Sequence, residues 1–65
     1  MTLVLVTVDG GIIDEVTFFE NKKRALQALE GYVKNMNEER NDAAIYDRNG
    51  FVANAKMYMK EEDMK

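Results

Sequence analysis

The sequence predicts an α+β fold with the element order ββαββ, in which one helix packs on one face of a four-stranded antiparallel sheet. Residues 21–38 repeat apolar residues at helical spacing, and four shorter segments rich in aliphatic and aromatic residues are joined in pairs by glycine-containing turns. A chain of 65 residues suits one domain, which we place at residues 1–59, followed by a charged C-terminal tail at residues 60–65.

The first hairpin is predicted at residues 3–19. Residues 3–8 are apolar on both faces and suit a central strand, whereas residues 12–19 carry two acids, which suit an exposed edge. The Asp-Gly-Gly sequence between them favours a two-residue turn, which places Leu3 and Leu5 with Ile12, Val16 and Phe18 on one face. A three-residue loop would turn the valines of the first strand to that face instead.

The helix is predicted to begin after Asn21, a residue type preferred at N-caps, and to continue to about residue 38. Its core stripe consists of Ala25, Leu26, Ala28, Leu29, Tyr32, Val33 and Met36. The first turn carries Lys22, Lys23 and Arg24 beside unpaired backbone N–H groups, which makes an anion site one alternative function.

The second hairpin is predicted at residues 43–59, with its turn at residues 47–50. The alternation of apolar residues favours a three-residue loop with Gly50 in the left-handed conformation, which pairs Ile45 with Ala53. The face under the helix is then expected to hold Ala43, Ile45, Phe51, Ala53, Ala55, Met57 and Met59. The simplest sheet has the strand order 2-1-3-4, with the helix crossing over strand one.

One helix is too small to cover this sheet. Four strands span roughly 19 Å, whereas a helix covers about 10 Å on a single side. The uncovered face is expected to display Val4, Val6, Val8, Ile13, Ala44, Tyr46, Val52 and Tyr58, interrupted by Glu15, Thr17, Asn54 and Lys56. Antiparallel sheets can present one face to water, but a large apolar face more often marks an interface. We expect that interface to include Val4, Val6, Tyr46, Val52 and Tyr58.

The residue types limit the chemistry. The chain has no Ser, Cys or His, which removes Ser–His and Cys–His nucleophiles and the imidazole and thiolate ligands of metals. Asp14 and Glu15 are neighbours on a strand, so their side chains are expected to point to opposite faces rather than act as a pair. The segment 47–50 matches a fragment of a calcium loop without its later ligands, and a turn explains it. We expect no enzymatic activity, no metal and no cofactor.

Net charge and hydropathy limit the classes of partner and the cellular location that the sequence predicts. Twelve acidic and nine basic residues give a net charge of −3, which disfavours nonspecific nucleic-acid binding. The apolar run at residues 3–8 is too short to span a membrane and lacks the basic flank of a secretion signal, so we expect a cytoplasmic protein. The sequence therefore predicts a small protein-interaction module that forms a homodimer through its uncovered face. The alternatives are a monomeric acidic regulator or inhibitor that docks on a larger, nucleic-acid-handling complex, and an anion or nucleic-acid binder using Lys22, Lys23 and Arg24.

Overall fold

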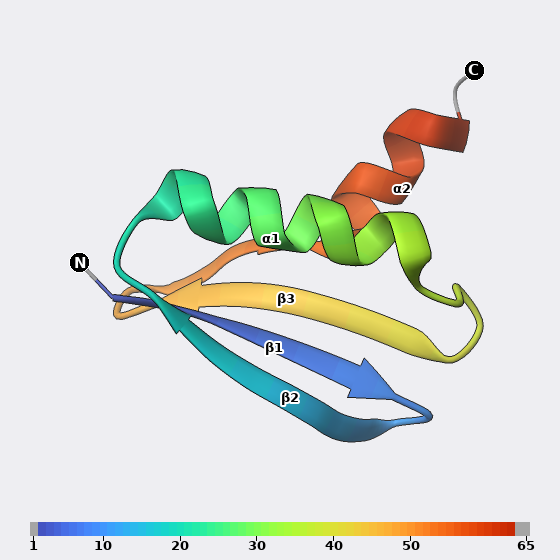
Figure 1. The fold of residues 1–65 in the computed structure, drawn as a ribbon, viewed down its shortest axis with the longest axis horizontal. Coiled ribbons are helices and arrows are strands. Elements are labelled where there is room, and N and C mark those ends of the chain that lie inside the picture. Colours follow the sequence, from blue (N-terminus) through green and yellow to red (C-terminus); the bar gives the residue numbers. More distant parts are fainter. Residues whose placement is uncertain (1, 64–65) are drawn as a thin grey trace.

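Four strands and two helices make up the computed structural model, which describes residues 2–63. The elements are β1 (Leu3–Asp9), β2 (Ile12–Phe19), α1 (Lys22–Asn35), β3 (Asn41–Asp47), β4 (Gly50–Asn54) and α2 (Ala55–Asp63). The strands form an open antiparallel sheet in the order β2-β1-β3-β4, and α1 lies along one face of it (Figure 1). The predicted fold class and strand order are confirmed, whereas the prediction of a single helix misses α2.

The core lies between α1 and the sheet face beneath it. The helix contributes Ala25, Leu29 and Val33, and Leu29 and Ile45 are fully buried. Burying a leucine or isoleucine side chain stabilises the fold by roughly 1.5–3 kcal/mol. The other buried apolar residues are Leu3, Leu5, Ala43, Ala53 and Ala55. The predicted helical stripe is confirmed, because its remaining members pack against this cluster while half-buried.

Side-chain caps set both ends of α1. At the start, the extended residue Asn21 accepts the Arg24 backbone N–H on its Oδ1 atom at 3.2 Å, as expected for an N-cap. At the end, Asn37 organises the following turn. Its carbonyl accepts the backbone N–H groups of Arg40 and Asn41, and its Oδ1 accepts that of Glu39. This turn ends the helix at Asn35, three residues earlier than the hydrophobic period predicts.

A β-bulge in β2 changes the face assignment of the first hairpin. The turn has two residues, as predicted, because Asp9 pairs with Ile12. The register then shifts by one residue, and Asp14 is left as the extra residue between the Val8–Ile13 and Thr7–Glu15 pairs. An extra residue exchanges the faces of everything that follows it. Val16 and Phe18 were therefore predicted on the wrong face: they pair with Val6 and Val4, opposite the helix.

The second hairpin departs from the prediction in three places. Asp47 pairs with Gly50, so the turn has two residues, Arg48 and Asn49, rather than the predicted three. Gly50 has a positive φ of 119° and Ile45 pairs with Ala53, both as predicted. An irregularity at Val52 then pairs Phe51 with Tyr46, so Phe51 lies on the face away from α1. The expected strand through residue 59 is also wrong, because β4 ends at Asn54. The Asn54 Oδ1 atom accepts the Met57 N–H at 3.1 Å and starts α2, which continues through part of the expected tail.

Candidate protein interface

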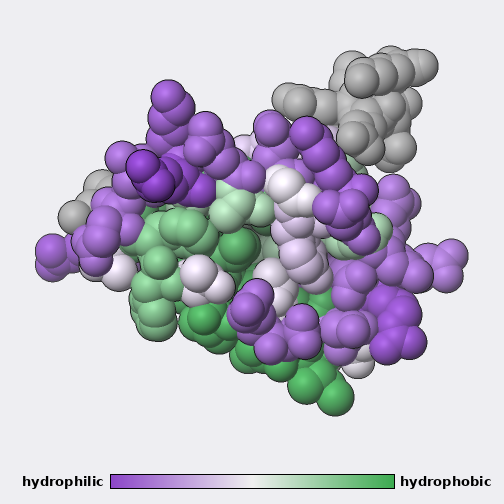
Figure 2. Space-filling view, viewed as in Figure 1, coloured by the Kyte–Doolittle hydropathy of each residue, from purple (hydrophilic) through white to green (hydrophobic). Residues whose placement is uncertain are grey.

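The side of the sheet opposite α1 is the candidate site, and we call it the open face. Cross-strand pairing places eleven side chains on it: Val4, Val6, Val8, Ile13, Val16, Phe18, Asp42, Ala44, Tyr46, Phe51 and Asn54. Phe18 is 69% exposed, Ile13 63% and Phe51 57%. In Figure 2 hydrophobic surface gathers along the lower margin, where Figure 1 shows β1 and β2, whereas hydrophilic surface covers α1 and the loop after it. A small protein rarely exposes so many large apolar side chains on one face.

The bulge explains why β2 presents no charge on the open face. Glu15 pairs with Thr7, a buried residue whose hydroxyl donates to the Glu15 carbonyl at 3.4 Å on the helix side. Asp14 occupies the bulge, and its charge reaches the Tyr32 phenol of α1. Burial is the largest cause that raises the pKa of Tyr32, and the charges of Asp14, Asp9 and Asp42 raise it further. The β2 residues left on the open face are Ile13, Val16 and Phe18, all apolar.

A shallow hollow of about 120 Å³ lies on the open face between β1 and β3. Ala44 forms its floor, because it is a small side chain flanked along β3 by Asp42 and Tyr46, and Val6, Val8 and Ala43 also line the hollow. The Asp42 carboxylate accepts the Ala43 backbone N–H at 2.8 Å. Beside the hollow, the rings of Tyr46 and Phe51 meet edge to face with centroids 6.2 Å apart and planes at 73°. Tyr46 therefore contacts Phe51 on one side and lines the hollow on the other.

The five predicted interface residues divide between two surfaces. Val4, Val6 and Tyr46 lie on the open face, as expected. Val52 and Tyr58 do not, because Val52 sits at the irregularity of β4 and Tyr58 belongs to α2. Both pack against the core instead. They line a groove of about 330 Å³ on the helix side, together with Lys22, Leu26, Ala53 and Met57.

The structure adds three aromatic or aliphatic residues to the face: Val16, Phe18 and Phe51. Sequence reasoning placed them under the helix, because a single inserted residue leaves no mark in composition or alternation. One available signal was the pair of adjacent acids in β2. Two charges next to each other suit a bulge as well as a solvent-facing edge.

The predicted anion site consists of three exposed side chains in the first turn of α1. Lys22, Lys23 and Arg24 are all exposed, and the Arg24 backbone N–H already donates to the Asn21 side chain. Lys22 lies at the groove beside β4 and α2. An anion at this turn would therefore meet exposed side-chain cations. It would find one fewer free backbone N–H group than at an uncapped helix start.

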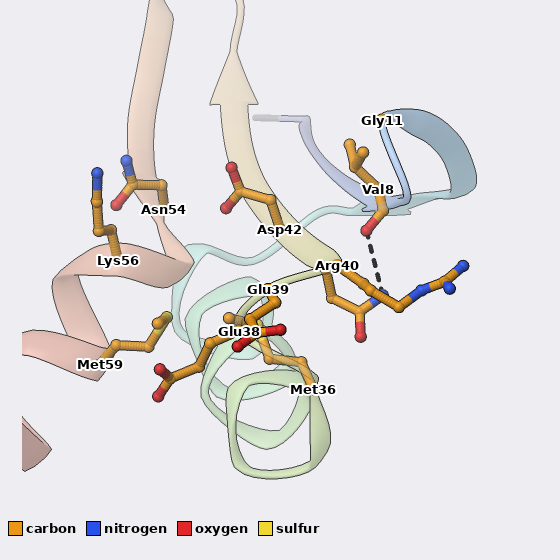
Figure 3. A pocket seen from close by; sticks show the side chains of 11 residues that line it. Val8, Gly11, Met36, Glu38, Glu39, Arg40, Asp42, Asn54, Lys56 and Met59 are labelled. Carbon is orange, nitrogen blue, oxygen red and sulfur yellow. Dashed lines mark hydrogen bonds between the residues drawn. The ribbon is translucent and has the colours of Figure 1, made fainter.

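A second, polar hollow of about 540 Å³ lies at the end of the sheet where α1 leads into β3 (Figure 3). Glu38, Glu39 and Asp42 extend toward it, with Lys56 on the side of α2. Arg40 extends away from it and forms an ion pair with Asp9 at 3.0 Å. Among the residues that the structure describes, no three acidic side chains come close enough to hold a metal ion. Beside the hollow, the Gly10 backbone N–H donates to the Arg40 carbonyl at 2.8 Å and joins the β1–β2 turn to the loop before β3.

Comparison of the chain with models of protein families, with curated proteins and with solved structures gave no match. Neither helix within residues 2–63 has both the length and the apolar composition needed to cross a bilayer.

Proposed function

We propose that this chain is a non-catalytic interaction module that forms a homodimer through its open face. One observation carries the proposal: of the eleven side chains that the four strands place on the side away from α1, nine are apolar. Removing such a surface from water stabilises association by about 25 cal/mol for each Å² buried. The apolar character is stronger than the sequence predicts, because the two register irregularities add Val16, Phe18 and Phe51.

The size of the open face determines what kind of dimer it supports. Four strands of about seven residues cover roughly 19 Å by 23 Å, a footprint of about 440 Å². A standard stable interface removes about 800 Å² from each partner. The open face therefore belongs to the small end of the range, and we expect a weak dimer whose population depends on protein concentration.

The test is the solution mass measured by light scattering over a wide range of protein concentrations. We expect a transition from monomer to dimer in the wild type. The double variant Val6→Glu, Tyr46→Glu is expected to stay monomeric, because it buries two unpaired carboxylates in each copy. Met57→Glu is the matched control: Met57 is an exposed apolar residue on α2, away from the open face, and this variant should dimerise as the wild type does.

A wild type that remains monomeric at every concentration would contradict the homodimer. The proposal of a monomeric acidic regulator would then take its place, with the open face as the docking surface. A double variant that dimerises normally would place the contact elsewhere on the chain.

A further inference from the structure

Three successive side chains of β3 on the open face form a pattern that a second copy can match. Tyr46, Ala44 and Asp42 alternate along the strand, so they project to the same side at intervals of about 6.7 Å. Tyr46 is a protruding ring, Ala44 is the floor of the hollow, and Asp42 is a hydrogen-bond acceptor. A rotation of 180° about an axis across the strands above Ala44 generates a second copy that faces the first. In this arrangement, the Tyr46 ring of each copy lies opposite the Asp42 acceptor of the other.

We propose that the two-fold axis of the homodimer lies above Ala44 and runs across the strands, so that each Tyr46 enters the hollow of the other copy and donates its hydroxyl to Asp42. This inference rests on the proposed homodimer and specifies its geometry. The half-turn lays β3 antiparallel on β3 of the second copy. Packed sheets lie about 10 Å apart, a gap that a tyrosine side chain and an aspartate side chain together can bridge.

The sizes of the side chains favour this axis over one that runs along the strands. Across the sheet, one row of the open face is bulky and another is slim. The bulky row carries three aromatic rings, Phe18, Tyr46 and Phe51, beside Val4, whereas the slim row carries no ring and consists of Val8, Ile13 and Asp42. An axis across the strands packs bulky against slim, as close packing requires. An axis along the strands packs bulky against bulky and leaves Asp42 without a donor.

Charge favours the same arrangement. Asp42 is the one charged side chain on the open face, and a face-to-face dimer buries it. Its carboxylate accepts the Ala43 N–H and has capacity for a further donor, which the phenol supplies. The two Asp42 residues of the dimer lie four residues apart along the strand direction, about 13 Å. That separation keeps their mutual repulsion smaller than it would be for carboxylates in contact, because the Coulomb energy falls with distance.

The experiment is a double-mutant cycle on the dimer dissociation constant, measured by sedimentation equilibrium. Tyr46→Phe keeps the ring and removes the donor, while Asp42→Asn keeps the shape and removes the charge. We expect each single variant to weaken the dimer by about a hundredfold, because the symmetric dimer loses two hydrogen bonds to charged groups at about tenfold each, and the double variant to be little weaker than either. Tyr58→Phe and Glu15→Gln make the same chemical changes off the open face and should leave the constant unchanged. Circular dichroism checks that every variant is folded.

Asp42→Asn also distinguishes a specific hydrogen bond to Asp42 from general charge repulsion, because the two predict opposite changes in the dimer dissociation constant. Removing a negative charge from an acidic chain reduces repulsion between copies and should tighten a dimer that does not use Asp42. A dimer that Tyr46→Phe or Asp42→Asn leaves equally tight or tighter would overturn this geometry while the homodimer itself stands. A wild type that never associates would overturn both.

An independent readout comes from nuclear Overhauser effects between differently labelled copies in a mixed sample. The axis across the strands brings the Tyr46 ring near the partner's Val8 methyl groups. The axis along the strands brings it near the partner's Val4 instead. An intermolecular signal from Tyr46 to Val4, with none to Val8, would contradict the proposed axis.

Discussion

Tyr32 shows how single side chains in this chain are tuned by the acids around them. It lies on α1 and packs against the core, and three aspartates are close enough for their charges to act on its phenol. Burial and negative charge both disfavour the phenolate, so they raise the pKa of Tyr32 above its ordinary value. The native state therefore retains the Tyr32 proton at a pH where the unfolded chain releases it.

This retention predicts a loss of stability at alkaline pH. The contribution of Tyr32 is constant below about pH 10, the unfolded pKa of tyrosine, and declines as the pH rises through the folded value. We expect Tyr32→Phe to reduce the decline, measured as the free energy of unfolding in urea from about pH 8 to about pH 11. Tyr58→Phe on α2 is the matched control. Identical pH profiles for the wild type and Tyr32→Phe would contradict the assignment.

At the scale of elements, the boundary between β4 and α2 depends on one side chain. Asn54 ends the strand opposite Ala44 and caps the helix through Met57. Residues 53–59 alternate in a way that suits a strand, yet they also contain the good helix formers Ala, Lys and Met. The cap favours the helical alternative because it satisfies a backbone N–H that the first turn would leave unpaired.

We therefore expect Asn54→Ala to weaken α2. The loss of an N-cap costs about 1 kcal/mol, and the helical circular dichroism signal at 222 nm should fall. Asn54→Asp keeps an acceptor and adds a favourable charge at the helix start, so it should retain the signal. Both are measured at a concentration where the wild type is monomeric, because Asn54 lies on the open face. An unchanged signal in Asn54→Ala would show that packing alone determines this helix.

The helices and strands are easier to predict from the sequence than the face of the sheet on which each strand residue lies. The helix start, the Gly10-Gly11 turn and the Ile45–Ala53 pairing follow from residue types with strong local preferences. The bulge at Asp14 does not, because its extra residue resembles any other residue of an exposed edge strand. The same difficulty affects the prediction of the interface residues. Val4, Val6 and Tyr46 were placed on the correct face, whereas Val52 lies at the irregularity of β4 and Tyr58 belongs to α2.

At the scale of the whole molecule, the chain is a two-layer slab of 33 × 27 × 17 Å. A domain of this size buries only about 60% of the surface that its unfolded chain exposes, so its stability is marginal. A second copy on the open face would add a third layer. Dimerisation would then contribute to folding stability in proportion to how fully the dimer is populated.

This linkage predicts that the thermal unfolding midpoint rises with protein concentration. A ligand that binds only the native state stabilises it by about 2.7 kcal/mol at one hundred times its dissociation constant, and a second copy acts in the same way. Differential scanning calorimetry at low and high concentration should show the rise in the wild type. The double variant Val6→Glu, Tyr46→Glu should show none. A midpoint independent of concentration in the wild type would exclude stabilising self-association.

The central position of β1 has a consequence for the order of folding. Its β2 neighbour follows across a two-residue turn, so that hairpin closes a very short loop. Its β3 neighbour arrives much later, and more than half of the chain separates Leu3 from Asp47. Closing that loop carries the larger entropic cost and is expected to limit the folding rate. During synthesis, β1 emerges before β3 and therefore waits with one edge unpaired until β3 has been made.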